Sequence, residues 1–439
     1  MEASEMLAAA ISARDADAAA RVLEQHPELK QRLNEGTPES SFGMQPLLAA
    51  VQWSDRRMVD VLLAAGADIN ERSEWWAGGF GVLDECSAEM APFLIERGAV
   101  VDAHAAARLG MLKKLQELVA ENPAVVHARG GDGQTPLHFA STLEIARFLL
   151  EHRADIDALD IDHESTPAQY MLRVMQARHF ARDRQDIARY LVAQGCKTDI
   201  LMAAALGNLP LVRQHLEADP ASIRTRVSEE YFPKQNPRSG GTIYIWIFGW
   251  HRTAHLVARD FGHEDVFQFL MEHSPEELKL SQACELGDEK TFRALLSSRP
   301  NLVETLTDDD RRRLPNAAQN NNTNAVRMML QAGWPTDVRG QHGMTPLHWA
   351  AWHGNAEMVR EILQFHPKLE SKDNDFGVTE VQAALHGSQN GWHRNTGDYG
   401  ATVELLLNAG AEAPEVTDDL EGSEAAREAL RRYAAGARS

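Results

Sequence analysis

One arrangement of apolar and polar positions recurs along the chain: a short helix, a turn, and a second helix with an apolar stripe. Its clearest copy, residues 343–373, reads GMTPLHWAAWHGNAEMVREILQFHPKLESKD. Two short helices cannot bury their apolar faces alone, so the pattern predicts that each pair stacks on further copies of itself. The apolar residues stand three or four positions apart, as on one face of a helix: Leu347, Ala350 and Ala351, then Met358, Val359, Ile362 and Leu363.

Three residues mark where the first helix of this copy begins and ends. Thr345 is suited to the N-cap, and Pro346 to the first helical position, where no N–H is needed. Gly354 can adopt the left-handed conformation that ends a helix. We therefore expect this helix to start at Pro346 and to end before Gly354.

The turn that follows the second helix gives the period of the pattern. It reads LLAAGADIN, LIERGAVVD, LLEHRADID, LVAQGCKTD, LQAGWPTDV and LLNAGAEAP, and in a variant with proline EQHPEL, AENPAV, EADPAS, MEHSPEE, SSRPNL and QFHPKL. The turn residues are His26, Gly66, Gly98, Asn122, Arg153, Gly195, Asp219, Ser274, Arg299, Gly333, His366 and Gly410. Their mean separation is about 35 residues, a period that indicates a repeat protein built from helix pairs.

A short motif at the start of the first helix identifies the kind of repeat. TPLH stands at 345–348 and 135–138, with degraded copies MQPLLAA (44–50), STPAQYM (165–171), RTAHLVA (252–258) and VTEVQAA (378–384). On these motifs the chain resembles the ankyrin-repeat proteins over nearly its whole length. The resemblance implies an all-α fold: an ankyrin-type α-solenoid of about twelve stacked helix-turn-helix units with short β-hairpin fingers. It also implies that His138 and His348 are structural and bond the backbone of neighbouring loops.

Departures from the period define the expected organisation of the chain. Residues 1–35 are predicted to form an N-terminal capping unit, residues 36–414 the repeat array, and residues 415–439 a C-terminal capping helix and tail. The array carries insertions at about 172–185, 228–250 and 386–399.

The composition of two insertions suggests their structure. Gly240–Gly241 before TIYIWIF predicts a turn into a strand, and hence an enlarged finger. The glycines of the last insertion, Gly387, Gly391 and Gly397, predict a loop. Long loops in a compact array are more often functional than idle.

Charge and cysteine content narrow the classes of partner. The 439 residues carry a net charge of −20, from 64 acidic and 44 basic residues. Such a surface repels a phosphate backbone, so we expect no nucleic-acid partner. The sequence has no run of about 18 apolar residues, so we expect no membrane partner either. We also do not expect its first residues to act as a signal peptide. Three separate cysteines suit a reducing, cytoplasmic location.

Residues after the paired alanines of the clearest copy form the first candidate binding site. Trp352 and His353 stand where ankyrin-like units vary and face outward, and Gln341, His342 and Met344 occupy the matching finger tip. We expect a recognition patch here, with tryptophan as its anchor. An ordinary solvated surface, or contact with the insertion of the next unit, is the open alternative.

Further aromatic residues are hard to explain as packing alone, and exposed large aromatics usually mark binding surfaces. These additional candidates are Trp75, Trp76, Trp250, His251, Trp392 and His393.

Motifs for cofactors and metals are missing from the sequence. It contains no HExxH, CxxC or DxDxDG pattern, and we predict no metal and no cofactor. The stretch DHEST places Asp162, His163 and Glu164 at a finger tip, where charged residues are usually part of a solvated turn. A metal site shared between neighbouring units stays open; its candidate ligands are His342, His353, His386, His393 and Asp398.

Two functions fit these observations. The first is a non-catalytic cytoplasmic scaffold that binds a protein partner through its concave face and finger loops, as the resemblance implies. The alternative is a small-molecule-binding protein or enzyme. Its pocket would be lined by His and Trp and would form between the concave face and the insertions 228–252 and 386–399. The acid–base candidates in that pocket are His251, His342, His353, His386 and His393.

Overall fold

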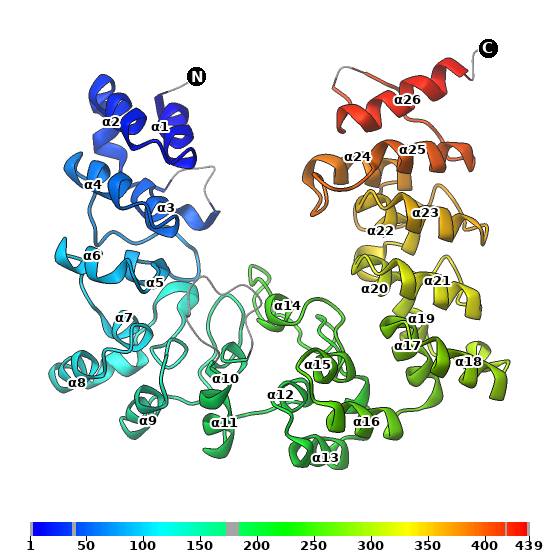
Figure 1. The fold of residues 1–439 in the computed structure, drawn as a ribbon, viewed down its shortest axis with the longest axis horizontal. Helices are drawn as coiled ribbons and strands as arrows, with labels where there is room; N and C mark the ends of the chain where they lie inside the picture. Colours follow the sequence, from blue (N-terminus) through cyan, green and yellow to red (C-terminus); the bar gives the residue numbers. More distant parts are fainter. Residues whose placement is uncertain (1–2, 37–40, 173–183, 418, 437–439) are drawn as a thin grey trace. The chain divides into compact units, whose positions relative to one another are not determined.

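The computed structural model describes residues 3–36, 41–172, 184–417 and 419–436 (Figure 1). These residues form α-helices, short 3₁₀-helices and connecting turns, and no β-strand is found among them. The chain divides into two compact units. Unit 1 comprises Met1–Asp219 and Thr225–Arg252, and unit 2 comprises Pro220–Arg224 and Thr253–Ser439.

Unit 1 is built from consecutive pairs of short helices. Its described α-helices are α1 (Ala3–Ser12), α2 (Ala16–Gln25), α3 (Pro46–Gln52), α4 (Arg56–Ala64), α5 (Val82–Glu85), α6 (Ala91–Glu96), α7 (Ala103–Arg108), α8 (Leu112–Glu121), α9 (Leu143–Glu151), α10 (Pro167–Tyr170), α11 (Gln185–Ala193), α12 (Ile200–Ala205), α13 (Leu209–Ala218) and α14 (Tyr244–Ile247).

Unit 2 repeats the same arrangement. Its described α-helices are α15 (Ala254–Asp260), α16 (Glu264–His273), α17 (Glu276–Leu286), α18 (Glu289–Ser298), α19 (Asp308–Arg311), α20 (Arg313–Gln319), α21 (Thr323–Ala332), α22 (Pro346–Trp352), α23 (Ala356–Leu363), α24 (Glu380–Asn390), α25 (Tyr399–Asn408) and α26 (Glu424–Gly436). None of the described helices is long and apolar enough to cross a membrane.

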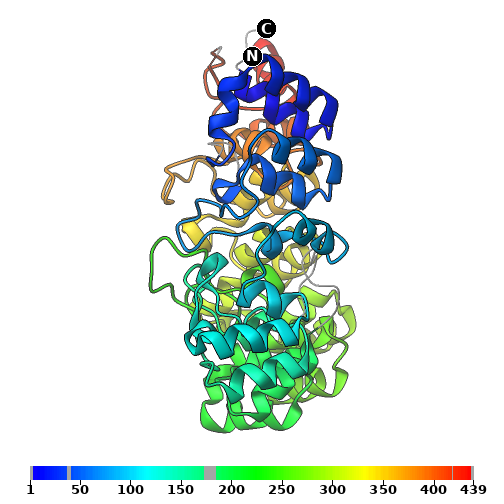
Figure 2. The same ribbon diagram turned by 90° about the vertical axis from the view of Figure 1, so that its left-hand side faces the viewer.

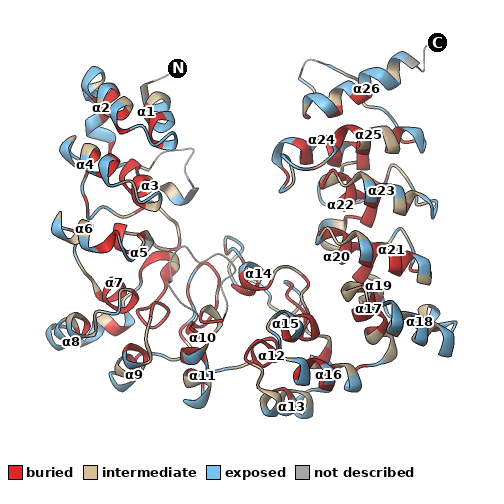
Figure 3. Ribbon diagram, viewed as in Figure 1, coloured by how far each residue is buried: buried red, intermediate tan, exposed pale blue. Residues whose placement is uncertain are grey.

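Within each unit the helix pairs stack in chain order. The first helices α1, α3, α5 and α7 contact one another in sequence, as do α20, α22 and α24, and each also packs on its own second helix. Figure 2 shows the pairs of unit 1 lying one above another. The first helices within the stacks, such as α7 and α22, are largely buried, whereas the outer helix α18 has no buried residue (Figure 3). The core therefore runs along the stack, between neighbouring pairs, as the repeat pattern predicts.

The helix ends of the clearest repeat follow the local signals of the sequence. Thr345 is the N-cap of α22, its hydroxyl accepts from the backbone N–H of His348 at 3.4 Å, and Pro346 is the first helical residue. Gly354 follows the helix with φ +62°. Asn355 then caps α23, accepting from the N–H of Met358 at 2.9 Å.

The fingers, which connect neighbouring helix pairs, are tight turns. The strands expected in them are not formed in the described residues. In two fingers the tip residue, Asp132 or His342, adopts a left-handed conformation, with φ +55° and +59° respectively. The carbonyl of each tip accepts from the following finger: Asp132 from the N–H of Ile161 at 2.8 Å, and His342 from that of Asp375 at 3.0 Å. Backbone hydrogen bonds thus tie successive fingers together.

The strand predicted in TIYIWIF is wrong, because this segment forms α14 instead. Tyr244, Ile247 and Phe248 stand three and four positions apart and are buried together, while Trp246 is 66% exposed. The segment is apolar throughout, so its period cannot separate a strand from a helical turn. A helical turn places residues 244, 247 and 248 on the same side, where all three are buried.

The loop predicted at 386–399 is only partly correct. Its first residues, up to Asn390, continue α24, which includes Gly387. Gly387 lies against the end of α22, where a Cβ would stand 2.2 Å from the carbonyl oxygen of Trp352, so this close approach requires a glycine. Residues 391–398 form the turn that follows.

The remaining predictions of organisation concern the ends and the first insertion. The insertion expected at about 172–185 lies mostly at 173–183, outside the described residues. At the ends, α1 packs on α2 and α3, and α26 packs on α24 and α25. The capping role of these helices stays a prediction.

Candidate functional site

A cavity of about 560 Å³ lies in unit 1. This volume falls within the range of small-ligand pockets, which combine apolar walls with a few convergent polar groups. Its apolar wall includes Phe42, Trp75, Phe80, Phe139, Ile243 and Trp246. Its polar groups include Asp132, Gln134, Asp162, His163, Tyr170 and Arg238.

The loop 160–165 positions the polar groups of this cavity. The Asp160 carboxylate is buried and accepts from the backbone N–H groups of His163 and Ser165 at 2.7 and 2.8 Å. It also accepts from the Tyr170 hydroxyl at 3.0 Å. Burial raises the pKa of Asp160, although these hydrogen bonds oppose the rise. Asp160 thus holds the backbone of the loop.

The insertion 228–252 packs directly on that loop. The N–H of Gly240 donates to the carbonyl of Asp162 at 2.9 Å, and the His163 Nδ1 lies 2.9 Å from the carbonyl of Gly241. The Glu164 carboxylate accepts from the N–H groups of Gln235 and Asn236 at 2.7 and 2.6 Å. The sequence predicts a solvated turn at DHEST. Asp162 and His163 are instead buried, because the insertion covers them.

Three side chains of potential metal-ligand type meet in the cavity wall. One ligand atom each of Asp132, Asp162 and His163 lies within 4.8 Å of the other two. The His163 Nε2 and Asp162 Oδ2 atoms are 3.6 Å apart. No other group of three histidine, cysteine, aspartate or glutamate side chains with ligand atoms this close together is found among the described residues.

One of the predicted aromatic residues, Trp75, lines this cavity, and its neighbour Trp76 contacts a further lining residue, Arg238. Trp75 packs edge-on against Phe42, with ring centroids 4.7 Å apart. Trp76 carries the guanidinium of Arg238 at 4.6 Å from its ring, a cation–π contact. Both tryptophans are half-buried. Trp246 is the most exposed aromatic residue of the wall.

Trp250 and His251 lie elsewhere in unit 1 and are not among the residues that line the cavity. Trp250 is half-buried, and its ring centroid is 6.0 Å from that of His251. The expected exposure of His251 is wrong, since it is 6% exposed. The physical reason is its place at the base of the insertion, where its backbone N–H donates to the carbonyl of Val227 at 2.8 Å.

In unit 2, the expectation that His353 faces outward is also wrong. His353 is 1% exposed, and its Nε2 lies 2.9 Å from the carbonyl of Gln319 in the preceding repeat. The segment after α24 covers it: the rings of Trp392 and His393 are 5.9 and 5.0 Å from its ring. Burial lowers the pKa of His353 to about 4.

The predicted residues around His353 occupy different environments. Trp392 is 62% exposed, whereas Trp352 is half-buried against the core. The backbone carbonyl of Trp352 accepts from the Tyr399 hydroxyl at 3.0 Å. His393 lies 3.3 Å from the amide nitrogen of Asn321. Trp352 and His353 thus contact the next insertion, which carries Trp392 and His393. Contact with that insertion is the alternative to a recognition patch that the sequence leaves open.

The finger tip 341–344 presents only part of the predicted patch. Met344 is buried, which contradicts its expected role at the surface: it packs into the core of unit 2. Gln341 accepts from the side chain of Gln319 at 2.8 Å. His342 is exposed, 3.1 Å from an Asp375 carboxylate oxygen, with its ring beside Phe376.

The metal site that the sequence leaves open between neighbouring repeats does not assemble among the residues that the structure describes. His342 pairs with Asp375, and His386 pairs with Glu421 at 2.7 Å. His353 and His393 remain near one another, beside a cavity of about 290 Å³.

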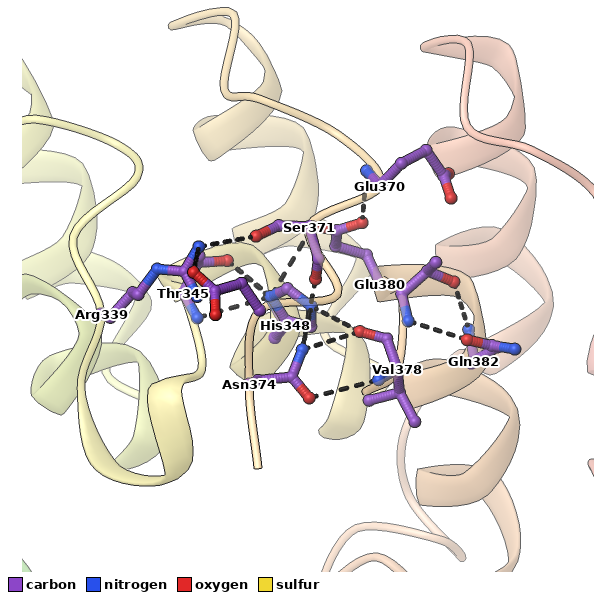
Figure 4. Close-up of polar contacts among 11 residues, drawn as sticks. Arg339, Thr345, His348, Glu370, Ser371, Asn374, Val378, Glu380 and Gln382 are labelled. Carbon is purple, nitrogen blue, oxygen red and sulfur yellow. Dashed lines mark hydrogen bonds and ion pairs between the residues drawn. The ribbon is translucent and has the colours of Figure 1, made fainter. Parts of the chain in front are cut away.

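The TPLH histidines are structural, as expected. His348 Nε2 lies 3.1 Å from the carbonyl of Val378, and its Nδ1 lies 2.7 Å from the Thr345 hydroxyl (Figure 4). The fully buried Glu380 carboxylate stands 3.6 Å from the same Nδ1. His138 makes the equivalent bonds in unit 1, and burial lowers its pKa to about 3.

Comparison with known proteins gives the same repeat. The family model "Ankyrin repeats (3 copies)" matches residues 103–202 and 280–373, and the model "Ankyrin repeat" matches residues 42–74. Together these matches cover more than half of the chain.

Two curated proteins share a short stretch of sequence with it. E3 ubiquitin-protein ligase XB3 of Oryza sativa subsp. japonica is 37% identical over 84 residues, which are 19% of this chain and 19% of that protein. Inversin-B of Xenopus laevis is 38% identical over 73 residues, 16% of this chain and 7% of that protein. The matched region is thus a fifth or less of either relative.

Proposed function

The chain belongs to the ankyrin-repeat family, and we propose that it is a binding scaffold whose unit 1 cavity takes up an apolar side chain of a protein partner. Ankyrin repeats are typically protein-interaction modules. A fold alone does not fix a function, so the proposal rests on the site. The observation that carries it is the exposed Trp246, 66% accessible, at a cavity with a largely aromatic and apolar wall.

The chemistry of the wall supports an interface. Tryptophan and arginine are enriched among residues that dominate binding energy, and the cavity places Trp75, Trp246 and Arg238 together. Phe42 at the same wall is 44% exposed. Solvent-exposed aromatic side chains at a concave site lose this exposure when a partner covers them, which favours association.

A photo-crosslinking residue in place of Trp246 tests this proposal. It is expected to capture a protein partner, whose affinity for the purified chain is then measured by calorimetry. Trp246→Ala is expected to weaken that affinity at least tenfold, as is typical of an aromatic anchor.

The matched control is Trp392→Ala in unit 2, because Trp392 is exposed to nearly the same degree, 62%. We expect Trp392→Ala to leave the affinity unchanged. Equal affinity of the Trp246 variant and the unsubstituted chain would refute the proposal, and loss with Trp392→Ala alone would move the interface to unit 2.

Binding of a small molecule is the second candidate function, supported by the cavity volume of about 560 Å³. The sequence-based form of this idea joins the insertions 228–252 and 386–399. The first of these belongs to unit 1 and the second to unit 2. We therefore place the candidate ligand in unit 1 alone, where a thermal shift on adding it would be abolished by Trp75→Ala.

A further inference from the structure

We propose that Asp132, Asp162 and His163 form a binding site for a divalent cation of the zinc class in the wall of the unit 1 cavity. One ligand atom of each residue lies within 4.8 Å of the other two. Asp162 and His163 are buried, and Asp132 is half-buried. All three line the cavity, which supplies a path for the ion.

The hydrogen bond of His163 fixes the form of its imidazole that binds metals. Its Nδ1 lies 2.9 Å from the carbonyl of Gly241, and a carbonyl can only accept, so Nδ1 carries the proton. Nε2 of the neutral ring then has a lone pair to offer, and this atom is the one that faces Asp162 at 3.6 Å. Metal-binding histidines commonly donate their other N–H to a backbone carbonyl in this way.

The spacing of His163 and Asp162 suits two ligands of a tetrahedral ion. Zinc binds nitrogen and oxygen at about 2.1 Å, which sets neighbouring ligands of a tetrahedron about 3.4 Å apart. The distance of 3.6 Å between His163 Nε2 and Asp162 Oδ2 is close to that value. It is also longer than a hydrogen bond, so direct hydrogen bonding does not explain the pairing.

The backbone holds the two ligand loops in place. Asp132 is the tip of its finger, and its carbonyl accepts from the N–H groups of Ile161 and Asp162 at 2.8 and 3.1 Å. The insertion fixes the other side, since Gly240 donates both to the carbonyl and to the carboxylate of Asp162. Ligands held in this way need little rearrangement to bind an ion.

The donor set determines the class of ion. Two carboxylates held this close repel one another, and a cation between them removes the repulsion. An imidazole ligand favours first-row transition ions and zinc over Mg²⁺ or Ca²⁺, which prefer oxygen ligands only. Three protein ligands leave a coordination position for water or for a group of a bound molecule.

Calorimetric titration of the full chain with ZnCl₂ tests the site. We expect one Zn²⁺ per chain, and at least a tenfold weaker affinity in each of Asp162→Asn and His163→Gln. The exposed pair of His342 and Asp375 in unit 2 gives the matched control, since His342→Gln removes the histidine of a similar His–Asp pair. This control should leave the affinity unchanged.

A measurement on the unsubstituted chain covers the case in which a variant does not fold. X-ray absorption at the zinc edge should show oxygen and nitrogen ligands, with one imidazole and no sulfur. No stoichiometric zinc binding, a sulfur ligand, two or more imidazoles, or folded Asp162 and His163 variants with unchanged affinity would each overturn the proposal.

Discussion

The imidazole of His163 and the carbonyl of Gly241 are joined by a hydrogen bond of 2.9 Å, although 78 positions separate them in the sequence. This bond joins the tip of a finger to the insertion 228–252. Further bonds from Glu164 and Asp162 to the same insertion surround it. The insertion is therefore part of the cavity wall, and the finger tip is not a solvated turn.

Glu164→Ala is expected to loosen the insertion without unfolding the helix pairs. The substitution removes the carboxylate that accepts from Gln235 and Asn236, two charge-assisted bonds at the surface. We expect a loss of about 1–2 kcal/mol in the local opening free energy of residues 232–248. Hydrogen exchange measures it directly.

The control for this prediction is Glu404→Ala on the outer surface of unit 2, where Glu404 pairs with Arg432. Exchange in residues 232–248 should be unaltered by that change. Unaltered exchange in the Glu164 variant would show that the two bonds do not hold the insertion.

Local signals make part of the fold predictable. Thr345, Pro346 and Gly354 determine helix ends through their own backbone and side-chain chemistry, and the structure follows them. The stripe of Met358, Val359 and Ile362 is buried as its spacing indicates. Such features depend on residues within about one helical turn, so a single sequence carries them.

Features that depend on distant segments are not predictable in the same way. The outward orientation expected for His353 is wrong, because nothing near it in the sequence shows that residues 392–393 fold over it. The cluster of Asp132, Asp162 and His163 draws its ligands from two fingers about 30 positions apart, beyond the reach of any short metal motif. The cover provided by the insertion, likewise, requires the structure.

Substitution of Tyr244 should destabilise the fold, whereas substitution of Trp246 should not. Tyr244 is fully buried and its hydroxyl donates to Asp199 at 2.8 Å, whereas Trp246 is 66% exposed. We expect Tyr244→Phe to cost about 1–3 kcal/mol, because it leaves a buried carboxylate oxygen without this donor. Trp246→Ala should change the free energy of unfolding by less than about 0.5 kcal/mol.

Urea unfolding measures both changes in free energy. Hydrogen exchange in α12 and α14 then locates the effect of Tyr244→Phe, because Tyr244 begins α14 and its partner Asp199 is the N-cap of α12. A Trp246 variant as unstable as the Tyr244 variant would mean that Trp246 supports the fold and is not available as a binding anchor.

The stability of unit 2 should fall as the solution is acidified, in part through His353. The pKa of this imidazole is about 4 in the folded chain and about 6.5 when unfolded, so between these values the unfolded chain binds the extra proton. The free energy of unfolding therefore decreases as the pH falls from 6.5 towards 4, by about 1.4 kcal/mol per pH unit for this group. Above about pH 6.5 the group contributes no slope.

Urea unfolding of the chain at several pH values measures the slope, and His353→Gln serves as the comparison. The glutamine amide can place a donor near the position of Nε2, which lies 2.9 Å from the carbonyl of Gln319 in His353, and it does not titrate. Between about pH 4 and 6.5, the free energy of unfolding of the variant should depend less steeply on pH, by about 1.4 kcal/mol per pH unit, the contribution of one proton. Identical slopes in the two proteins would exclude His353 as the source.

Gly354→Ala is expected to destabilise the contact between α22 and the last helix pair. The residue has φ +62°, and a Cβ there would stand 2.9 Å from the ring of Tyr399. Backbone strain alone costs about 1–2 kcal/mol for a residue with a side chain, and displacement of the buried ring adds to it.

Gly377 separates the two causes, since it has nearly the same φ, +63°, and a Cβ at this position would meet nothing within 4 Å. Gly377→Ala should thus show the backbone cost alone, and Gly354→Ala should exceed it by at least about 1 kcal/mol in urea unfolding. Hydrogen exchange in α25 locates the effect, because Tyr399 is the first residue of that helix. Equal costs for the two variants would show that the ring of Tyr399 moves aside freely.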